Sequence, residues 1–447
     1  DRVEIGAPVI GAAASLSLEG DAHLNGGTAS ADVTITRTDG PIGVLSLKGA
    51  YSNTDKMLDL AINLEEGADG IAANLLNLPR LPSTKLTVVG AGPLHDFKAD
   101  IALATAGKER LTGQVELLGH GPDPTADTAS DQRFRASISG DIAPIFLPEY
   151  RDFFGDDVLL TAKGLRQANG ALTLEELRVT TDALALSGQL ALAAGGWPEA
   201  FALTGQLADP SGNTVLLPFS GEKTKVNSAN IVVHYDRAAG EEWRAEALLS
   251  TLARDDFALQ GAKIVASGTL SRGDGTAIGQ VAGNVSLSAS GFVPADDALA
   301  MAIGTDLSGE LSFAWQEDGP LSVSEINLTG ADYRLTGDVQ ADGFKSGVNV
   351  ETQEALSLSA DDLTRFAPLL GADLSGALRV KLSGAANLLG GAFDLRMAGL
   401  GQEVSLGQPR FDPLISGVST LDLEVVRDEI GTRIPRRTPR RPCCQRH

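Results

Sequence analysis

Apolar and polar residues alternate along almost the whole chain, and this period of two constrains the fold more than any other feature. The pattern is clearest within Asp361–Gly431, where charged residues separate many of the apolar ones. The alternating apolar positions there include Leu378, Val380, Leu382, Phe393, Leu395 and Met397. A period of two predicts β-strands with one apolar face and one solvent-exposed face. We therefore expect an all-β protein.

The length of the chain limits how such strands can be arranged. A single core rarely grows beyond about 250–300 residues, and this chain has 447. Glycine is abundant at 51 residues and aromatic residues are only 5% of the chain, which favours many short strands and turns. About thirty strands exceed the roughly ten that an open sheet tolerates before it curls or splits. A long sheet with one apolar face must therefore fold over on itself, pack a second sheet or cover another apolar body.

Three short segments interrupt the strand pattern with helical spacing or helix-capping signals. They are Gly70–Leu78, Pro144–Phe154 and Asp361–Leu370. The residues that end them are Pro79, Gly155 and Gly371. Asp361 and Asp362 stand where an N-cap and a first-turn acid favour a helix, whereas we expect Asp296–Asp297 in a turn. One helical cap followed by a ladder of strands is the unit that we expect the chain to repeat.

The expected organisation follows from these segments and from a change of composition near the end. The expected regions are a β-repeat region at 1–140 with a short helix near 70–78, a β-repeat region at 141–360 that opens with a helical insert at 144–154, a β-repeat module at 361–432 with a helical cap at 361–370, and a basic tail at 433–447. The tail contains arginines and no acid, and the alternation stops just before it. We expect this tail to be disordered or non-native.

A short phrase recurs in which a small polar residue precedes glycine, any residue and an apolar residue. Its glycines are Gly113, Gly188, Gly205, Gly268, Gly309, Gly337 and Gly376. Because glycine permits tight turns and bulges, we expect one at each position, with the apolar residue starting the next inward face. Breaks in the alternation also separate Leu172–Leu174 from Leu177–Val179, and Phe393–Met397 from Val404–Leu406, into different expected strands.

The charge balance and the scattered polar residues argue against nucleic-acid binding and catalysis. Lys and Arg number 36 against 58 Asp and Glu, which gives a net charge of −22 that would repel phosphates. The five histidines are too scattered to suggest a metal pair, and adjacent acids on a strand point to opposite faces. The only two cysteines, Cys443 and Cys444, lie in the tail. We therefore expect no catalytic residue, no metal and no cofactor.

Three stretches carry a resemblance to a known family. Leu58–Gly119 joins Leu-Glu-Glu-Gly, a short helix ending Leu-Pro-Arg-Leu-Pro, and Leu-Thr-Gly-Gln-Val-Glu-Leu. Leu147–Leu192 contains Leu-Pro-Glu-Tyr-Arg-Asp-Phe-Phe-Gly, and Phe366–Asp428 contains Phe-Ala-Pro-Leu-Leu-Gly-Ala-Asp-Leu-Ser-Gly-Ala-Leu. Together these stretches resemble the TamB family of the AsmA-like superfamily, the translocation and assembly module proteins of Gram-negative bacteria. The resemblance spans nearly all of residues 1–431.

The resemblance implies an elongated, mostly antiparallel β-sheet bent into a trough with an apolar interior. It also implies a periplasmic body that is tethered to the inner membrane by an N-terminal helix and works with an outer-membrane barrel of the TamA type. The implied functions are assembly and secretion of outer-membrane proteins and transport of phospholipid between the two membranes. The chain would then be an interior fragment without the anchor, with the barrel protein and phospholipid acyl chains as partners.

Residue patterns alone leave three functions open. In the first, the apolar faces form a groove for acyl chains, lined by the six alternating residues from Leu378 to Met397. The same residues would serve equally well as the dry core of a β-sandwich. In the second, exposed strand edges hold unfolded outer-membrane clients. In the third, the chain is a β-helical surface protein or polysaccharide enzyme, although regular coil periods and a cluster of acids on one sheet are missing from the sequence.

Overall fold

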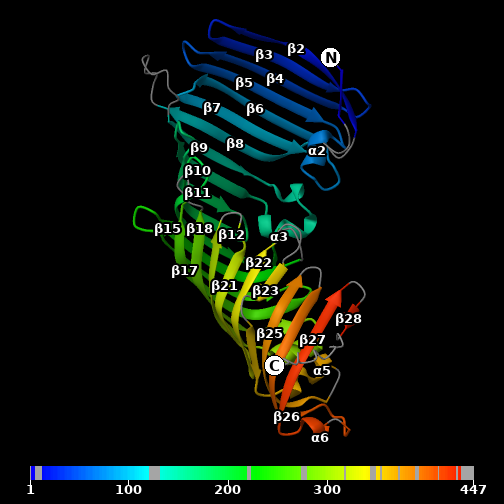
Figure 1. Ribbon diagram of the computed structural model, residues 1–447. Coiled ribbons are helices and arrows are strands. Elements are labelled where there is room, and N and C mark those ends of the chain that lie inside the picture. The colour runs from blue at the N-terminus through cyan, green and yellow to red at the C-terminus, as the bar shows by residue number, and fades with distance from the viewer. Residues whose placement is uncertain are drawn as a thin grey trace, which may run out of the picture. The chain divides into compact units, whose positions relative to one another are not determined.

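Antiparallel pairing between neighbouring strands is the main feature of this fold (Figure 1). The computed structural model describes residues 2–5, 13–119, 131–218, 223–272, 279–316, 319–342, 349–352, 355–370, 373–387, 392–410, 412–428 and 431–433. Strands account for most of these residues, and the helices are short. The expected all-β class is therefore confirmed. The chain divides into two compact units, Asp1–Gly240 and Glu241–His447.

The strands of the first unit follow one another in a meander. They are β1 (Arg2–Ile5), β2 (Ala14–Asn25), β3 (Thr28–Arg37), β4 (Gly43–Ser52), β5 (Met57–Glu66), β6 (Thr84–Pro93), β7 (Asp96–Thr105), β8 (Lys108–Gly119), β9 (Gln132–Gly140), β10 (Val158–Arg166), β11 (Leu172–Thr180), β12 (Leu184–Leu192), β13 (Pro198–Ala208), β14 (Val215–Leu216) and β15 (Lys225–Asp236). From β1 to β13, each strand pairs antiparallel with the next. The pairing then passes from β13 to β15, and the short β14 pairs with the start of β15.

The second unit repeats the meander, with one strand position divided between two short strands. Its strands are β16 (Glu242–Ala253), β17 (Phe257–Ser271), β18 (Gln280–Ser290), β19 (Val293–Pro294), β20 (Leu307–Gln316), β21 (Leu321–Thr329), β22 (Tyr333–Asp342), β23 (Asn349–Thr352), β24 (Leu356–Ala360), β25 (Ser375–Asn387), β26 (Phe393–Ser405), β27 (Val418–Asp428) and β28 (Gly431–Arg433). Both β23 and β24 pair with β22 on one side and β25 on the other. Together they therefore fill the place of one strand.

Short helical inserts lie in connections between strands, and within each unit they all lie at the same ends of the strands. They are α2 (Ile71–Leu75), η1 (Ala143–Ile145), η2 (Pro148–Tyr150), α3 (Arg151–Phe154), α4 (Asp297–Ile303), η3 (Thr364–Phe366), α5 (Ala367–Leu370) and α6 (Asp412–Ile415). Successive strands run in opposite directions, so every second connection returns to the same edge. All three expected helical segments contain such inserts. The helix α4 corrects the expected turn at Asp296–Asp297, because Asp296 is its N-cap and accepts a hydrogen bond from Leu299 N–H at 2.9 Å.

Buried apolar side chains gather where the inserts meet the ends of the strands. The first cluster comprises Ala143, Phe153, Phe154, Val158, Ala183 and Val215. The second comprises Ala360, Leu363 and Leu374. In the first cluster Phe146 also stacks on Phe154, with 4.1 Å between ring centroids. These clusters hold the inserts against the ends of the strands and close that side of the sheet with packed side chains.

The recurring glycines lie inside strands, which corrects the expected turns, whereas the expected bulge is found at Gly376, where the register between β25 and β26 shifts. All seven belong to the strands β8, β12, β13, β17, β20, β22 and β25. Gly268 pairs with Gly283, and a Cβ atom on Gly268 would overlap with the carbonyl oxygen of Ala282. A Cβ atom on Gly283 would lie 2.6 Å from the Trp243 ring. Glycine is therefore needed here because backbone and ring approach the position closely.

The expected break after Leu174 is a β-bulge inside one strand. The register between β11 and β12 shifts between Leu174 and Leu177, and the register between β21 and β22 shifts in the same way between Val323 and Ile326. A bulge adds one residue and reverses the alternation without ending the strand. The segments expected as two strands around Ala398 are likewise one strand, β26.

The division between the two units falls after Gly240, away from the regions expected to meet near residues 140 and 360. Near residue 140, β9 and β10 pair along their whole length. Near residue 360, β24 pairs with β25. Both expected borders thus lie within continuous ladders. Residues 434–447 of the expected tail lie outside the described residues.

We expect Glu66→Ala to destabilise the first unit by uncapping α2. The carboxylate of Glu66, which is 6% exposed, accepts hydrogen bonds from Ile71 N–H at 3.1 Å and Ala72 N–H at 2.7 Å. These amides have no partner within the helix. Urea denaturation should show a loss of about 1–2 kcal/mol in the free energy of unfolding. Glu65→Ala, at the exposed neighbouring position, should cost less than about 0.5 kcal/mol, and equal losses in both variants would contradict the capping role.

Candidate functional site

The six residues predicted to line a groove lie on one face of two adjacent strands, β25 and β26. The paired positions are Leu378 with Gly401, Val380 with Gly399, Leu382 with Met397, Gly384 with Leu395 and Ala386 with Phe393. The charged residues between them are exposed, namely Arg379, Lys381, Asp394 and Arg396. The fold therefore brings all six candidates together on an apolar face and leaves the charges on the other face.

This apolar face continues across the neighbouring strands of each unit. In the second unit one row of paired residues comprises Leu287, Gly309, Leu328, Leu335, Leu358, Val380, Gly399 and Leu421. In the first unit a row comprises Val33, Leu47, Ile62, Val88, Ile101, Gly113, Ile138, Leu160, Val179, Leu186, Gly205 and Ile231. We call these two rows the apolar lanes. Each lane crosses its strands and forms a continuous apolar path through several hairpins.

The apolar face is mostly half-buried, and this distinguishes it from the core of a β-sandwich. In β9, β12 and β17, half-buried residues alternate with exposed neighbours. A second sheet packed on the face would bury it completely. Five of the six candidate residues are half-buried, and Val380 alone is buried, with 2% of its surface exposed. The described residues thus present an apolar face without a second sheet over it.

The opposite face carries ion pairs between neighbouring strands. Lys98 in β7 and Arg135 in β9 both contact Glu116 in β8, at 2.7 and 3.1 Å. The hydrogen bond from Lys98 lowers the pKa of the Glu116 carboxyl and raises the pKa of Lys98 itself. Each exposed pair adds little stability. Their arrangement shows instead that this face is the one that solvent covers.

Arg365 ties two helical inserts together at the edge of the second unit's apolar face. Its guanidinium forms an ion pair with Asp332 and donates hydrogen bonds to the carbonyl oxygens of Met301 and Ala302, both at 3.4 Å. Burial raises the pKa of the neighbouring Tyr333. Arg365 in η3 is thereby joined to the end of α4. The two inserts are held together where they flank the apolar face.

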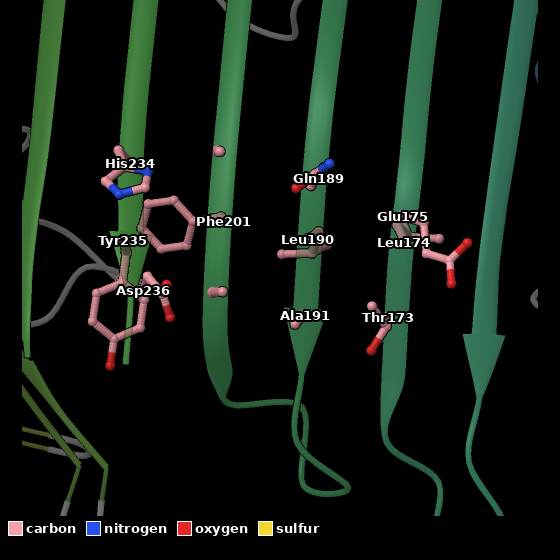
Figure 2. A pocket seen from close by; sticks show the side chains of 12 residues that line it. Thr173, Leu174, Glu175, Gln189, Leu190, Ala191, Phe201, His234, Tyr235 and Asp236 are labelled. Atoms are coloured by element: carbon pink, nitrogen blue, oxygen red, sulfur yellow. The ribbon is translucent and has the colours of Figure 1, made fainter. Parts of the chain in front are cut away.

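A hollow of about 310 Å³ lies on β11, β12, β13 and β15 of the first unit (Figure 2). Its lining includes Leu174, Leu190, Phe201, Tyr235, Gln189 and His234. Phe201 and Tyr235 occupy paired positions with ring centroids 5.4 Å apart, and Tyr235 is 1% exposed. The sequence gives no sign of this hollow, because it does not show that β13 pairs with β15 past the short β14.

Two kinds of feature are absent from the part of the chain that the structure describes. No group of three His, Cys, Asp or Glu side chains is arranged there to hold a metal ion. No helix among these residues has the length and apolar content to cross a membrane. The chain matches no protein-family model, no curated protein and no solved structure.

Burial predicts different tolerance to charge at two positions of the face. Val380→Glu places a carboxylate at a buried position, so we expect a loss of about 3 kcal/mol or more in the free energy of unfolding. Leu395→Glu places it at a half-buried position and should cost about 1 kcal/mol. Urea denaturation of both variants measures the difference. If Leu395→Glu unfolds as readily as Val380→Glu, Leu395 belongs to a closed core.

Proposed function

We propose that the apolar face of this chain binds the acyl chains of phospholipids and conducts them across the cell envelope as part of a TamB-like bridge. The observation that carries this proposal is the pair of half-buried apolar lanes, which cross many strands without a covering sheet. Apolar surface of this extent marks a binding site far more often than it remains in contact with water. The proposed occupant must therefore be long and apolar.

An acyl chain fits such a lane because it needs apolar contact and no specific polar partner. Each methylene group removed from water contributes about 0.8 kcal/mol, so six contribute about 5 kcal/mol. The lanes consist of aliphatic residues and glycines. Consecutive positions are thus chemically similar, and a bound chain would exchange one position for the next at little cost.

The charge of the protein favours binding of lipid tails over binding of lipid headgroups. The net charge of −22 opposes adsorption to anionic membrane surfaces. Charged side chains lie on the face opposite the lanes, as the pairs around Glu116 illustrate. We therefore propose that the tail lies on the apolar face while the headgroup stays in water at its border.

The cellular setting of this activity comes from the resemblance to TamB and is part of the proposal. We propose a periplasmic body that is tethered to the inner membrane and meets a TamA-type barrel in the outer membrane. In this setting the bridge would supply phospholipid to the outer membrane and support assembly and secretion of outer-membrane proteins.

Mass spectrometry of lipid extracted from the purified chain tests the proposal. We expect phospholipid in roughly stoichiometric amount or above, because several chains fit along lanes of this length. A control protein of similar net charge, purified in the same way, gives the background. A folded chain with no phospholipid above that background would contradict the proposal.

We expect Leu395→Glu to reduce the phospholipid retained per protein by about half or more, because a carboxylate would oppose an acyl chain on this part of the face. Thr420→Glu is the matched control, since it adds the same charge at an exposed position of the adjacent strand β27. The control should retain lipid as the parent chain does. Equal retention by both variants would remove Leu395 from the binding face.

A further inference from the structure

The hollow on β11, β12, β13 and β15 opens on the face of the first unit opposite the apolar lane (Figure 2), which we call the solvent face. Successive side chains of a strand point to opposite faces. Tyr235 lies four residues after Ile231 of the lane and therefore shares the apolar face. His234 and Asp236, on either side of Tyr235, point to the solvent face. Because Val233, the next residue on the apolar face, does not line the hollow, the side chains around the hollow belong to the solvent face.

Three alanines form the floor of the hollow. Ala191 in β12 pairs with Ala200 in β13, and Ala202 stands two residues further along β13 on the same face. Each alanine side chain is a single methyl group, so these positions lie lower than the longer side chains around them. The floor is therefore a level apolar patch on a face that is otherwise polar.

Five polar side chains surround this floor. They are Thr173 and Glu175 on β11, Gln189 on β12, and His234 and Asp236 on β15. The two outer strands are three strand spacings apart, which is about 14 Å. The space that these side chains enclose is about 310 Å³, at the lower end of the range for small-molecule sites. The hollow therefore has room for one or two small rings.

The charges of the rim favour a neutral ligand. Lysine and arginine are missing from the described lining of the hollow. Glu175 is paired with Arg133 at 2.9 Å and with Lys163 at 3.4 Å, both outside the lining, and the hydrogen bond from Arg133 lowers the pKa of the Glu175 carboxyl. Asp236 accepts a hydrogen bond from Ala238 N–H at 2.9 Å. An anion would therefore meet carboxylate oxygens, whereas the charge of Glu175 is already compensated.

We propose that this hollow binds a neutral saccharide of one or two rings. A sugar ring has a face of C–H groups that would pack on the alanine floor, and hydroxyl groups around its edge that both donate and accept hydrogen bonds. The carboxylate of Asp236 accepts such bonds, and the amide of Gln189 both donates and accepts them. A purely apolar ligand would cover these groups without pairing them, which costs free energy. This inference does not depend on lipid binding, because the hollow and the apolar lane lie on opposite faces.

Saturation-transfer NMR of the full chain with cellobiose, a neutral disaccharide, tests the proposal. We expect saturation to pass from the protein to the C–H protons of the sugar, with a dissociation constant of about 1–10 mM because a shallow hollow buries little surface. Glucose 6-phosphate as an anionic probe and N-acetyl-lysine amide as a cationic probe should bind at least about fivefold more weakly. No binding of cellobiose would overturn the proposal. Equal or tighter binding of either charged probe would overturn the assignment to a neutral saccharide.

Two substitutions on β13 test whether the sugar lies on the alanine floor. Ala202→Phe places a ring on the floor and should weaken cellobiose binding about tenfold or more. Thr204→Phe adds the same ring two residues further along β13, on the same face but outside the lining, and should leave binding unchanged. Both positions are exposed, so neither substitution disturbs a core. Equal binding by the two variants would overturn the location of the site.

Truncation of the rim keeps the proposal open to failure even if circular dichroism shows that Ala202→Phe misfolds. Gln189→Ala and His234→Ala each remove a hydrogen-bonding group from an exposed position and should weaken cellobiose binding about two- to tenfold. Ser187→Ala is the matched control, since it removes a polar group from the same face of β12 outside the lining. It should leave the affinity unchanged. Full binding by both Gln189→Ala and His234→Ala would overturn the polar contacts.

Discussion

The whole structure depends on backbone hydrogen bonding between strands that are neighbours in sequence. Each hairpin satisfies the peptide groups of two strands and at the same time places their apolar residues on a common face. Among the described residues, both buried clusters include insert residues such as Phe153 and Leu363. Side-chain burial therefore fixes the inserts to the ends of the strands, and backbone hydrogen bonds hold the rest of the sheet together. The half-buried apolar face follows from this division, since no second layer of sheet is needed to complete the ladder in either unit.

The sequence predicts the class of this fold well because alternation is a local property. The positions of strands such as β9 and β12, and the helical inserts around α2, α3 and α5, follow from patterns within a few residues. The bulges at Glu175 and Glu325 break the pattern without ending the strand. Mid-strand glycines such as Gly268 mislead for a related reason. They are required because a neighbouring backbone approaches closely, and the local sequence does not reveal that approach.

The candidate site, like the fold, can be predicted from the sequence only in part. Alternation alone places Leu378, Leu395 and their companions on one face, and the structure agrees. The difference between buried Val380 and half-buried Leu395 depends on what packs over each position, which the pattern cannot report. The hollow beside Phe201 and Tyr235 depends on a pairing that skips β14. Features of this kind depend on the pairing of strands, which a local sequence pattern does not contain.

The position of the helical inserts has a consequence for how such a chain can change in length during evolution. The described inserts of a unit lie at the same ends of the strands, because an even number of strand positions separates one insert from the next. Gain or loss of a whole hairpin would lengthen or shorten the unit by about 10 Å and keep every later insert at its edge. Gain of a single strand would reverse the direction of everything after it and move the later inserts to the opposite edge. Nearest-neighbour ladders tolerate the first change as repeat proteins do, so the hairpin is the natural unit in which this architecture can be made to span different distances.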